Sequence, residues 1–317
     1  MKTATATEPS PAGITATVLA HSRNAANGVE IVSWLLRYHR FVHGELMAHR
    51  VFGRNAASSR AIPVARVIRE VLRDPAVPVA WGRAQRGMTA GAALSPARAW
   101  LCRRLWLSAR YPAVAAAWAM SRLGIHKQHA NRVLEPFQWM TCVVTATDWG
   151  NFYALRTAAD AQPEMRELAM AMLRAHAASV PKVLQPGDWH LPFWRPEDET
   201  ALTGLTAAAD LPPHAVVNCR LKVCTARCVR ASYANFYGKD DWGADIGLHD
   251  RSVALRHFSA FEHCAVAAEC RHPCGHLRGW KPYRKSFSGE SGEPATPFDA
   301  AALLAAIESD PNRKASD

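Results

Sequence analysis

The stretch Glu45–Arg60 constrains this chain more than any other part of it. Residues 41–50, which overlap the first part of this stretch, are expected to form a helix. A turn beginning at Gly53 is expected to break that helix. The turn then presents a loop with Ser58, Ser59 and Arg60. A guanidinium holds a phosphate at two points, and hydroxyl and backbone N–H groups complete such a cradle. The stretch therefore predicts a nucleotide-phosphate and cofactor site, with a solvated basic surface as the alternative.

Size and charge limit the classes of protein to consider. A chain of 317 residues with 49% hydrophobic residues has enough core for one large domain or two ordinary ones. A net charge of +11 attracts polyanions, among them nucleotides, cofactor phosphates, folates and nucleic acid. No apolar run is long enough for a membrane span, and no secretory signal is recognisable, so we expect a cytoplasmic protein without a membrane partner.

The spacing within the stretch resembles a known signature. His49-Arg50, followed by Ser58 and then Arg60, is similar to the Arg-His-Arg, Ser and Arg pattern of the flavin-dependent thymidylate synthases. Ala48 replaces the first Arg of that signature, and Ala56 replaces a Glu. The sequence from His49 to Pro63 resembles phage-type relatives more than cellular enzymes. The resemblance extends over residues 28–292 and is strongest at 41–62 and 131–164.

The resemblance implies an α+β fold of mixed helices with an antiparallel sheet. It implies methylation of a deoxypyrimidine monophosphate at the fifth ring carbon, with dUMP converted to dTMP. FAD relays the one-carbon unit, methylenetetrahydrofolate donates it and NADPH supplies the reducing equivalents. No enzyme nucleophile is required, so the cysteines are not expected to act in catalysis. The family forms homo-oligomers with sites near subunit interfaces, so we expect a dimer or tetramer, in the host cytoplasm if a phage encodes the chain.

The substrate residues follow from the same resemblance. Arg132 opens an Arg-x-Leu-x-Pro segment that is expected to join the phosphate site, and Arg156 ends an Asn-x-x-x-x-Arg segment expected to meet the base. Because a guanidinium only donates hydrogen bonds, Arg156 suits a uracil carbonyl and a ring nitrogen that loses its proton. We assign catalysis to Arg156 and Ser58. The predicted substrate-binding residues are Glu45, Ser58, Ser59, Arg60, Arg132 and Arg156.

The flavin contacts are also implied by the resemblance, since the chain has no Gly-x-Gly-x-x-Gly fingerprint for binding a dinucleotide in Rossmann fashion. His49, Arg50 and Val51 match positions that meet the ring system and the diphosphate. A core histidine beside a strand is the alternative interpretation of His263. The predicted cofactor-binding residues are His49, Arg50, Val51, Asn55, Asn151 and His263.

Two alternatives to dUMP methylation stay open. Glu45 stands where the family has Gln, and an ionised carboxylate only accepts hydrogen bonds, which favours the amino group of cytosine. A dCMP methylase, or a hydroxymethylase acting on dCMP or dUMP, is therefore an alternative that would supply a modified nucleotide for phage DNA. The other alternative is a non-catalytic nucleotide-binding or nucleic-acid-binding protein, although nucleic acid is not the expected partner.

The order of the motifs predicts an internal repeat. His257–His263 looks like the family's His-x-Ser-Pro-Phe-Glu-His motif with Ala260 in place of Pro, yet it follows the signature instead of preceding it. Gly279–Arg284 resembles a degraded signature helix. We therefore predict two copies of the family's amino-terminal half. The expected segments are a loose start (1–27), a first synthase-like region (28–185), a proline-rich linker (186–215), a second half-repeat (216–292) and a tail (293–317).

Apolar periodicity predicts the individual elements. Strands are expected at 29–37 and 138–145, and residues 216–232 have a β-like pattern. Helices are expected at 64–73, 95–123, 126–132 and 246–256, with two more beginning at 149 and 160. Trp118, Met120 and Leu123 are expected in the core. The helix beginning at 160 is expected to bury an apolar stripe of Met165, Leu168, Ala169, Met172 and Leu173.

Cysteines and histidines gather late in the chain. Their spacing matches no standard zinc finger, so we interpret the cysteines as ordinary buried thiols and assign no metal ligand. A structural zinc site is the alternative. The cluster consists of Cys219, Cys224, Cys228, Cys264, Cys270, His272, Cys274 and His276.

Overall fold

The computed structural model describes residues 7–10, 12–233 and 241–290, together with 300, 301, 305 and 309. The chain divides into two units, Met1–Tyr283 and Arg284–Asp317. The fold that positions the predicted site lies in the first unit. The predicted tail (293–317) lies almost wholly outside the described residues.

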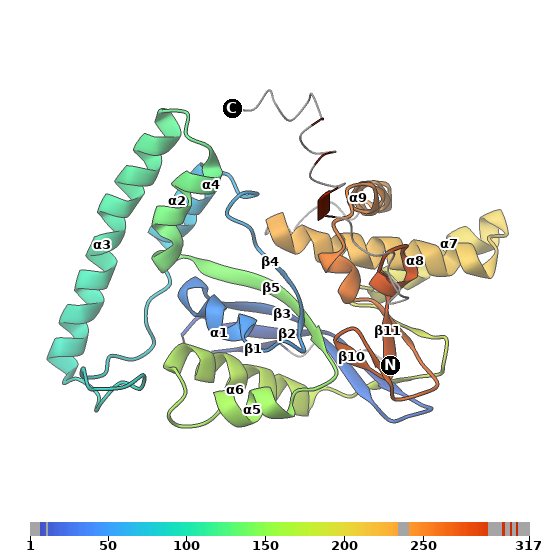
Figure 1. Cartoon of the computed structure of the whole chain (residues 1–317), viewed down its shortest axis with the longest axis horizontal. Helices are drawn as coiled ribbons and strands as arrows, with labels where there is room; N and C mark the ends of the chain where they lie inside the picture. The colour runs from blue at the N-terminus through green and yellow to red at the C-terminus, as the bar shows by residue number, and fades with distance from the viewer. Residues whose placement is uncertain are drawn as a thin grey trace. The chain divides into compact units, whose positions relative to one another are not determined.

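A mostly antiparallel sheet forms the centre of the first unit (Figure 1). Its strands are β1 (Thr7–Pro9), β2 (Thr15–Asn24), β3 (Glu30–His39), β5 (Trp139–Ala146) and β4 (Gly53–Ala56), in that spatial order. A further strand, β6 (Lys182–Leu184), pairs in parallel with β2. Trp34, Leu36 and Tyr38 of β3 are completely buried, as the alternating pattern of this segment predicts. The predicted α+β class with an antiparallel sheet is confirmed.

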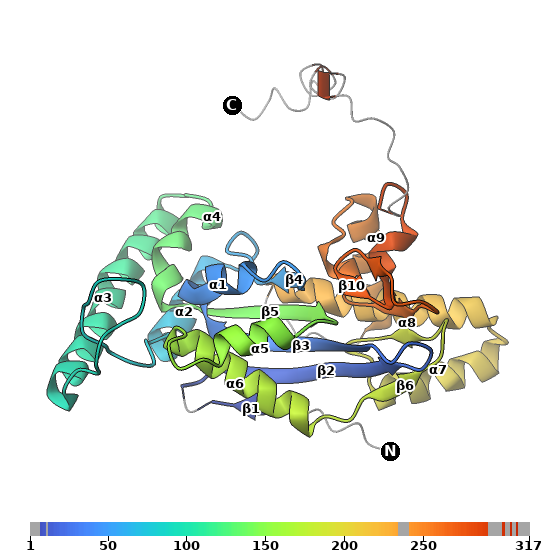
Figure 2. The same ribbon diagram turned by 60° about the horizontal axis from the view of Figure 1, so that its bottom comes forward.

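Helix α6 (Pro163–Ala178) lies along β2 and also contacts β1 and β3 (Figure 2). Met165, Leu168, Ala169 and Met172 of the predicted α6 stripe are completely buried, as their helical spacing predicts, but Leu173 of the same stripe is 37% exposed. The other elements of this region are η1 (Arg40–Val42), α1 (His43–Met47), α2 (Val64–Arg73), α3 (Pro96–Arg122), α4 (Lys127–Ala130), η2 (Arg132–Phe137), α5 (Gly150–Arg156) and α6 (Pro163–Ala178). None of the described helices is long and apolar enough to cross a membrane.

The later part of the first unit packs against the same sheet. Val143 of β5 shares a buried cluster with Cys228, Ala231 and Ala260. A smaller sheet has the order β11-β8-β7. The elements are β7 (Trp189–His190), α7 (Pro196–Ala209), α8 (Pro213–Val229), η3 (Arg230–Tyr233), α9 (Trp242–Ala254), η4 (Ser259–Glu262), β8 (Ala265–Ala267), β9 (Pro273–Cys274), β10 (Leu277–Arg278), β11 (Trp280–Pro282) and η5 (Tyr283–Ser286).

The start of the chain is not loose as predicted. Residues 7–9 and 15–24 form β1 and β2, and Ile14 and Ala16 are completely buried. The segment is rich in Ala, Thr and Ser, so its composition resembles that of a loop. Its long pairing with β3 supplies the backbone hydrogen bonds that decide the structure.

The predicted turn at Gly53 is also wrong, because Gly53 begins strand β4 and pairs with Thr145 of β5. The absence of a side chain at Gly53 has a packing reason. A Cβ there would lie 2.5 Å from Nε2 of His276, so the imidazole ring occupies the space that a side chain would need.

Three expectations for the later region need correction. The linker 186–215 contains the helix α7, and the β-like segment 216–232 is mostly the helix α8. Both helices begin with proline in the first turn, which favours a helix start over the intrinsic preference of valine and cysteine for strands. Gly279–Arg284 contains the strand β11 where a signature-like helix was expected. The predicted internal repeat therefore lacks the helix that would match the signature, and the repeat itself stays a prediction.

The long helix α3 confirms the predicted helix at 95–123. Two of its side chains that were predicted to be in the core are exposed. Trp118 is 58% exposed and Leu123 is 80% exposed. The helix packs on the core through Ala117, which is completely buried, and through Trp106, whose ring lies 5.6 Å from that of Phe137 in η2. The opposite face carries large exposed apolar side chains, namely Trp100, Leu101, Leu105, Tyr111 and Trp118.

Candidate functional site

His49 and Arg156 meet at the signature, where the chain passes from α1 into β4. His49 is buried between the rings of Phe52 and Phe152, with centroid distances of 5.5 Å and 5.0 Å. Nε of Arg156 donates to Nε2 of His49 at 3.0 Å. Because the guanidinium only donates, Nε2 has no proton and the neutral ring has its proton on Nδ1. Burial, followed by the charges of Arg156 and Arg54, lowers the pKa of His49, which keeps the imidazole neutral at pH 7.

Glu45 adjoins this pair. Nη2 of Arg156 donates to the backbone carbonyl of Glu45 at 3.4 Å. The side-chain Oε2 of Glu45 is shielded from solvent and has no hydrogen-bond partner among the described residues. Buried polar atoms are usually paired, so an unpaired carboxylate oxygen beside an arginine is a feature of a binding site. The two residues predicted to meet the base are therefore brought together.

Arg54 has a structural part in this arrangement. Its Nη1 donates to the carbonyls of Leu46, Met47 and His49 at distances of 2.8 to 3.3 Å. These carbonyls lie at the end of α1 and just after it, and those of Leu46 and His49 also accept from the backbone N–H groups of His49 and Phe52. The guanidinium thus closes the helix and holds the backbone at His49.

A second cluster forms around one oxygen of Glu135, at the other end of β4. Oγ of Ser59 donates to Oε1 of Glu135 at 2.9 Å and accepts from Nη2 of Arg40 at 2.8 Å. Arg40 and Arg132 also contact the same Oε1, at 2.8 Å and 2.9 Å. This carboxylate orients two guanidiniums beside the predicted phosphate loop.

The loop itself faces solvent at Arg60. Oγ of Ser58 accepts from the backbone N–H of Arg60 at 3.3 Å, and the Ser58 N–H donates to the carbonyl of Ser232. Arg60 is exposed, and the side chain of Arg132 is 60% exposed. Ser59 and Arg132 therefore meet at Glu135, and Ser58 and Arg60 flank Ser59 in the same loop. Phosphate binding by these residues stays a prediction.

The sequence interpretation missed Arg40. Its side chain is only 12% exposed, and burial lowers the pKa of the guanidinium although Glu135 acts to raise it. The signal in the sequence was a basic residue directly after a strand and before the signature helix. Arg40 lies before the stretch Glu45–Arg60, so the signature pattern does not include it.

The two clusters lie on either side of β4. Glu45, His49 and Arg156 are grouped before the strand, while Arg60 and Arg132 are grouped after it. No contact between described residues joins Arg156 to Arg60 or to Arg132. A strand of this length spans roughly 13 Å, and it lies between His49 and Arg60 along the chain.

The predicted flavin contacts divide into exposed and enclosed residues. Arg50 and Asn151 are exposed, and Val51 is 44% exposed. Asn55 is buried: its Nδ2 donates to the carbonyl of Cys228 at 2.6 Å, and its Oδ1 accepts from the hydroxyls of Ser232 and Ser259. In this structure Asn55 therefore joins β4 to the end of α8 and to η4.

His263 lies at the end of a buried chain of hydrogen bonds. Its Nδ1 is 2.9 Å from Oγ1 of Thr145, and Thr145 contacts the hydroxyl of Ser33 at 2.5 Å. The Ser33 hydroxyl lies 2.9 Å from Nε2 of His190, whose Nδ1 contacts Ser22 at 2.9 Å. Nε2 of His263 has no hydrogen-bond partner among the described residues. Burial lowers the pKa of both histidines to about 3, so both rings are neutral at pH 7.

The cysteine and histidine cluster does not form a metal site within the described part of the chain. The one described group with suitable ligand positions consists of His21, Glu30 and His176. All eight cysteines are free, and Cys224, Cys228 and Cys264 are buried. Burial raises the pKa of Cys224 and of Cys228, so both remain protonated thiols.

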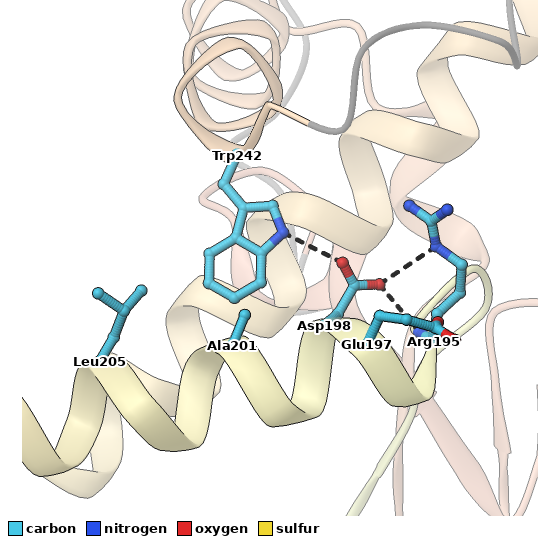
Figure 3. A pocket seen from close by; sticks show the side chains of 6 residues that line it. All are labelled: Arg195, Glu197, Asp198, Ala201, Leu205 and Trp242. Carbon is cyan, nitrogen blue, oxygen red and sulfur yellow. Dashed lines mark hydrogen bonds and ion pairs between the residues drawn. The ribbon is translucent and has the colours of Figure 1, made fainter.

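A surface hollow lies away from the signature, between α7 and the start of α9 (Figure 3). The Asp198 carboxylate in its wall accepts hydrogen bonds from Nε1 of Trp242 at 3.1 Å, from the backbone of Arg195 at 3.0 Å and from Arg227 at 2.8 Å. Burial acts to raise the pKa of Asp198, but these hydrogen bonds lower it to about 2. Both oxygens are thus occupied in closing the start of α7. The residues lining the hollow are Arg195, Glu197, Asp198, Ala201, Leu205 and Trp242.

Comparisons with known proteins identify the family. The family model described as thymidylate synthase complementing protein matches residues 25–182. No curated protein matches the chain. Among solved structures, the UMP/dUMP methylase PolB from Streptomyces cacaoi bound with 5-Br dUMP is 21% identical, with a TM-score of 0.38 over 47% of this chain and 67% of that one. The same methylase bound with 5-Br UMP is 18% identical, with a TM-score of 0.42 over 52% of this chain and 88% of that one. Through residues 25–182, the chain belongs to the thymidylate synthase complementing protein family and is by family a thymidylate synthase-like methyltransferase.

Proposed function

We propose that this protein methylates a deoxypyrimidine monophosphate at the fifth ring carbon and converts dUMP to dTMP. FAD, methylenetetrahydrofolate and NADPH are the proposed cofactor and co-substrates. The observation that carries the proposal is the contact between Arg156 and His49, which joins the signature to the arginine expected at the base. Family membership supplies the reaction class.

The phosphate is bound by the cluster after β4. Arg60 and Arg132 are exposed cations, and the Ser58 hydroxyl accepts from the backbone N–H of Arg60. Two guanidiniums and a hydroxyl are groups that suit a dianionic phosphate. Ser59 and Glu135 orient the arginines instead of binding the phosphate, because Ser59 is buried and its hydroxyl is already engaged with Glu135 and Arg40. Ser58 keeps its hydroxyl at the loop surface.

The base is bound by Arg156. Nε of this residue is held by His49 and Nη2 contacts the Glu45 carbonyl, so we assign the remaining guanidinium donors to the substrate. A donor placed where negative charge develops on the ring carbonyl stabilises the transition state without reorganisation. The aromatic rings of Phe52 and Phe152 hold His49, and through it the guanidinium.

The residues present fit a flavin at the surface of the signature. Arg50 offers an exposed positive charge for a diphosphate, and Asn151 lies exposed on α5, the helix that also carries Arg156. Val51 offers apolar contact for a ring system. When bound, FAD supplies the reducing equivalents that convert the transferred carbon to a methyl group. Asn55 and His263 complete the proposed set, although the protein encloses both in this structure.

A homo-oligomer accounts for the separation of the two clusters. We propose that a dimer or tetramer completes each half-site with residues from a neighbouring copy. The exposed apolar face of α3 supports this proposal, because Trp100, Leu105 and Trp118 have no cover within the described chain. The proposed location is the cytoplasm, or the host cytoplasm for a phage protein.

One observation favours a second candidate, the methylation or hydroxymethylation of dCMP. The side-chain Oε2 of Glu45 is buried and unpaired among the described residues, and the backbone carbonyl of the same residue contacts Arg156. An ionised carboxylate accepts hydrogen bonds only. The 4-amino group of cytosine donates a hydrogen bond that the 4-carbonyl of uracil does not offer. A base bound with this edge toward Glu45 would therefore be cytosine.

Product analysis tests both candidates. The purified protein is incubated with dUMP or dCMP, FAD, methylenetetrahydrofolate and NADPH, and the nucleotides are weighed by mass spectrometry. The proposal expects dTMP from dUMP. A methyl or hydroxymethyl product from dCMP alone selects the second candidate. Unchanged nucleotides in every mixture, with a protein that retains FAD, would contradict both.

A Glu45→Gln variant serves as the matched comparison, because it restores the residue that the family resemblance expects at this position. It should increase the preference for dUMP over dCMP. The Gln side chain offers a donor to a carbonyl and differs little in size from Glu.

A further inference from the structure

Three potential metal ligands gather where β2 and β3 meet the end of α6. His21 lies on β2, Glu30 begins β3 and His176 is in the last turn of α6. One ligand atom from each side chain lies within 4.8 Å of the other two. Nε2 of His21 and Oε2 of Glu30 are 3.2 Å apart. Two imidazoles with one carboxylate are a frequent ligand set for divalent transition metals.

The hydrogen bonds of Ser179 determine which nitrogen of His21 carries a proton. Its hydroxyl donates to the backbone carbonyl of His176 at 3.0 Å, and this bond uses its only proton. The same oxygen is 2.6 Å from Nδ1 of His21, so it accepts a hydrogen bond from that nitrogen. In a neutral His21 ring, Nε2 then has a free lone pair.

That lone pair faces an oxygen of Glu30. Two acceptors at 3.2 Å repel each other unless a cation lies between them. The opposite tautomer would place a proton there, but Ser179 would then have to give up its bond to the His176 carbonyl. Protonating both ring nitrogens of His21 would also satisfy these contacts, as an ion pair with Glu30. The contacts therefore favour a positive charge at this position, either a second proton on His21 or a metal ion, and metal binding distinguishes the two.

Glu30 is oriented for this role by Arg23. Nε and Nη2 of Arg23 both donate to Oε1 of Glu30, at 2.9 Å and 2.6 Å. This leaves Oε2 directed at His21 as a single ligand atom. A carboxylate whose second oxygen is hydrogen-bonded by the protein is typical of the surroundings of a metal ligand.

His176 is oriented in a similar way. Its Nδ1 lies 3.1 Å from the hydroxyl of Tyr153, and its ring packs edge-on against Trp34 with centroids 6.0 Å apart. A hydroxyl that accepts from Nδ1 leaves Nε2 free to bind a metal. The buried indole of Trp34 gives the site an apolar wall.

We propose that His21, Glu30 and His176 bind a divalent transition metal of the zinc class. In a tetrahedral zinc site, with bonds of about 2.0 to 2.1 Å, two ligand atoms lie about 3.3 Å apart, close to the separation of His21 and Glu30. Binding draws the third ligand atom inward, and the fourth position is left to water. The metal ties the β2–β3 hairpin to α6, separately from His49 and Arg156, so this proposal does not depend on the proposed reaction.

Zinc binding by the full chain tests the proposal. The protein is dialysed against a chelator and then against Zn²⁺, and the bound metal and the melting temperature are measured. We expect about one zinc per chain, as tight sites fill stoichiometrically, together with a higher melting temperature. His176→Gln and Glu30→Gln should each weaken zinc binding at least tenfold. Ser179→Ala, which removes the acceptor for His21, should weaken it by about 10- to 100-fold.

A Cys270→Ser/His272→Gln double variant is the control, because it alters the other metal-binding residue types without touching these three. It should bind zinc as tightly as the unmodified protein. Co²⁺ in place of zinc should show no thiolate charge-transfer absorption, since all three ligands are nitrogen or oxygen.

Three results would overturn the proposal. One is less than about 0.2 zinc per chain in the unmodified protein with no change in melting temperature. The second is unchanged zinc affinity in both His176→Gln and Glu30→Gln. The third is loss of zinc in the control variant. The melting temperature of the unmodified protein with and without zinc keeps the test valid if a variant does not fold.

Discussion

Replacing Arg156 tests the proposed chemistry at a single side chain. Nε of Arg156 is held by His49 and Nη2 contacts the Glu45 carbonyl, and the remaining donors are the ones we assign to the base. In Arg156→Ala the substrate loses one positioned donor to developing negative charge, which typically costs about 10²- to 10³-fold in kcat, or roughly 3 to 4 kcal/mol. Affinity for the monophosphate should change much less, because the phosphate cluster around Ser58 and Arg60 remains intact.

Arg156→Lys should recover little of this loss. Lysine has one ammonium group, so it cannot contact Nε2 of His49 and the base together as the guanidinium fork does. Arg174→Ala is a suitable control, because Arg174 is 46% exposed and has only a long ion pair of 3.9 Å with Glu8. It should leave kcat and affinity unchanged.

The assay separates turnover from binding. Steady-state kinetics gives kcat, and calorimetric titration gives the Kd for the nucleotide. A large increase in Kd with unchanged kcat in Arg156→Ala would refute the assigned role. Wild-type behaviour of both Arg156 variants would refute it as well.

Three further predictions concern the phosphate cluster and the buried histidines. Arg60→Ala should weaken nucleotide binding by roughly 2 to 4 kcal/mol, and Arg132→Ala by less, since Arg132 is 60% exposed and shares Glu135 with Arg40; unchanged titrations in both variants would show that the phosphate lies elsewhere. Ser33→Ala breaks the contact between His190 and Thr145 and should cost about 1 to 3 kcal/mol in urea unfolding, whereas a loss below about 0.5 kcal/mol would contradict a stabilising chain. Because the folded-state pKa of His190 and His263 is about 3, below the unfolded value near 6.5, the unfolded chain binds more protons between these pH values. The contribution of these histidines to the free energy of unfolding should therefore be complete above pH 6.5 and should fall as the pH decreases toward 3, by up to about 1.4 kcal/mol per pH unit for each histidine. Equal urea midpoints at pH 7 and pH 5 would contradict this.

Several elements were predictable because one physical signal dominated them. The stripe of α6 and the buried strand β5 follow directly from apolar spacing. Strand β2 was missed because its Ala, Thr and Ser residues resemble a loop, while its pairing partner β3 decides its structure. Helix α8 was taken for β-like because of its valines, since tertiary packing outweighs such weak preferences.

The candidate site shows the same division. The sequence pattern led to the residues His49 and Arg156, which lie 107 positions apart, and the structure brings them into contact. Arg40 and Glu135 were missed, because a carboxylate that organises a basic cluster has no distinctive sequence pattern. The sequence also did not show that β4 separates Arg156 from Arg60, because Gly53 was interpreted as a turn.

The group of His21, Glu30 and His176 was beyond the reach of sequence reasoning for a similar reason. Its members belong to two strands and a helix, and only the packing of α6 on β2 brings them together. No short spacing of the kind that identifies zinc fingers connects them.

The central claim is that the signature of this chain holds a flavin beside a pyrimidine nucleotide. Flavin absorption during a nucleotide titration tests it most directly, because the spectrum responds only if the two ligands bind in one site. We predict that the purified protein retains FAD and that dUMP or dCMP shifts its absorption bands in a saturable manner, with a weaker response in Arg60→Ala. A protein that binds no FAD, or a bound flavin whose spectrum neither nucleotide changes, would contradict the claim.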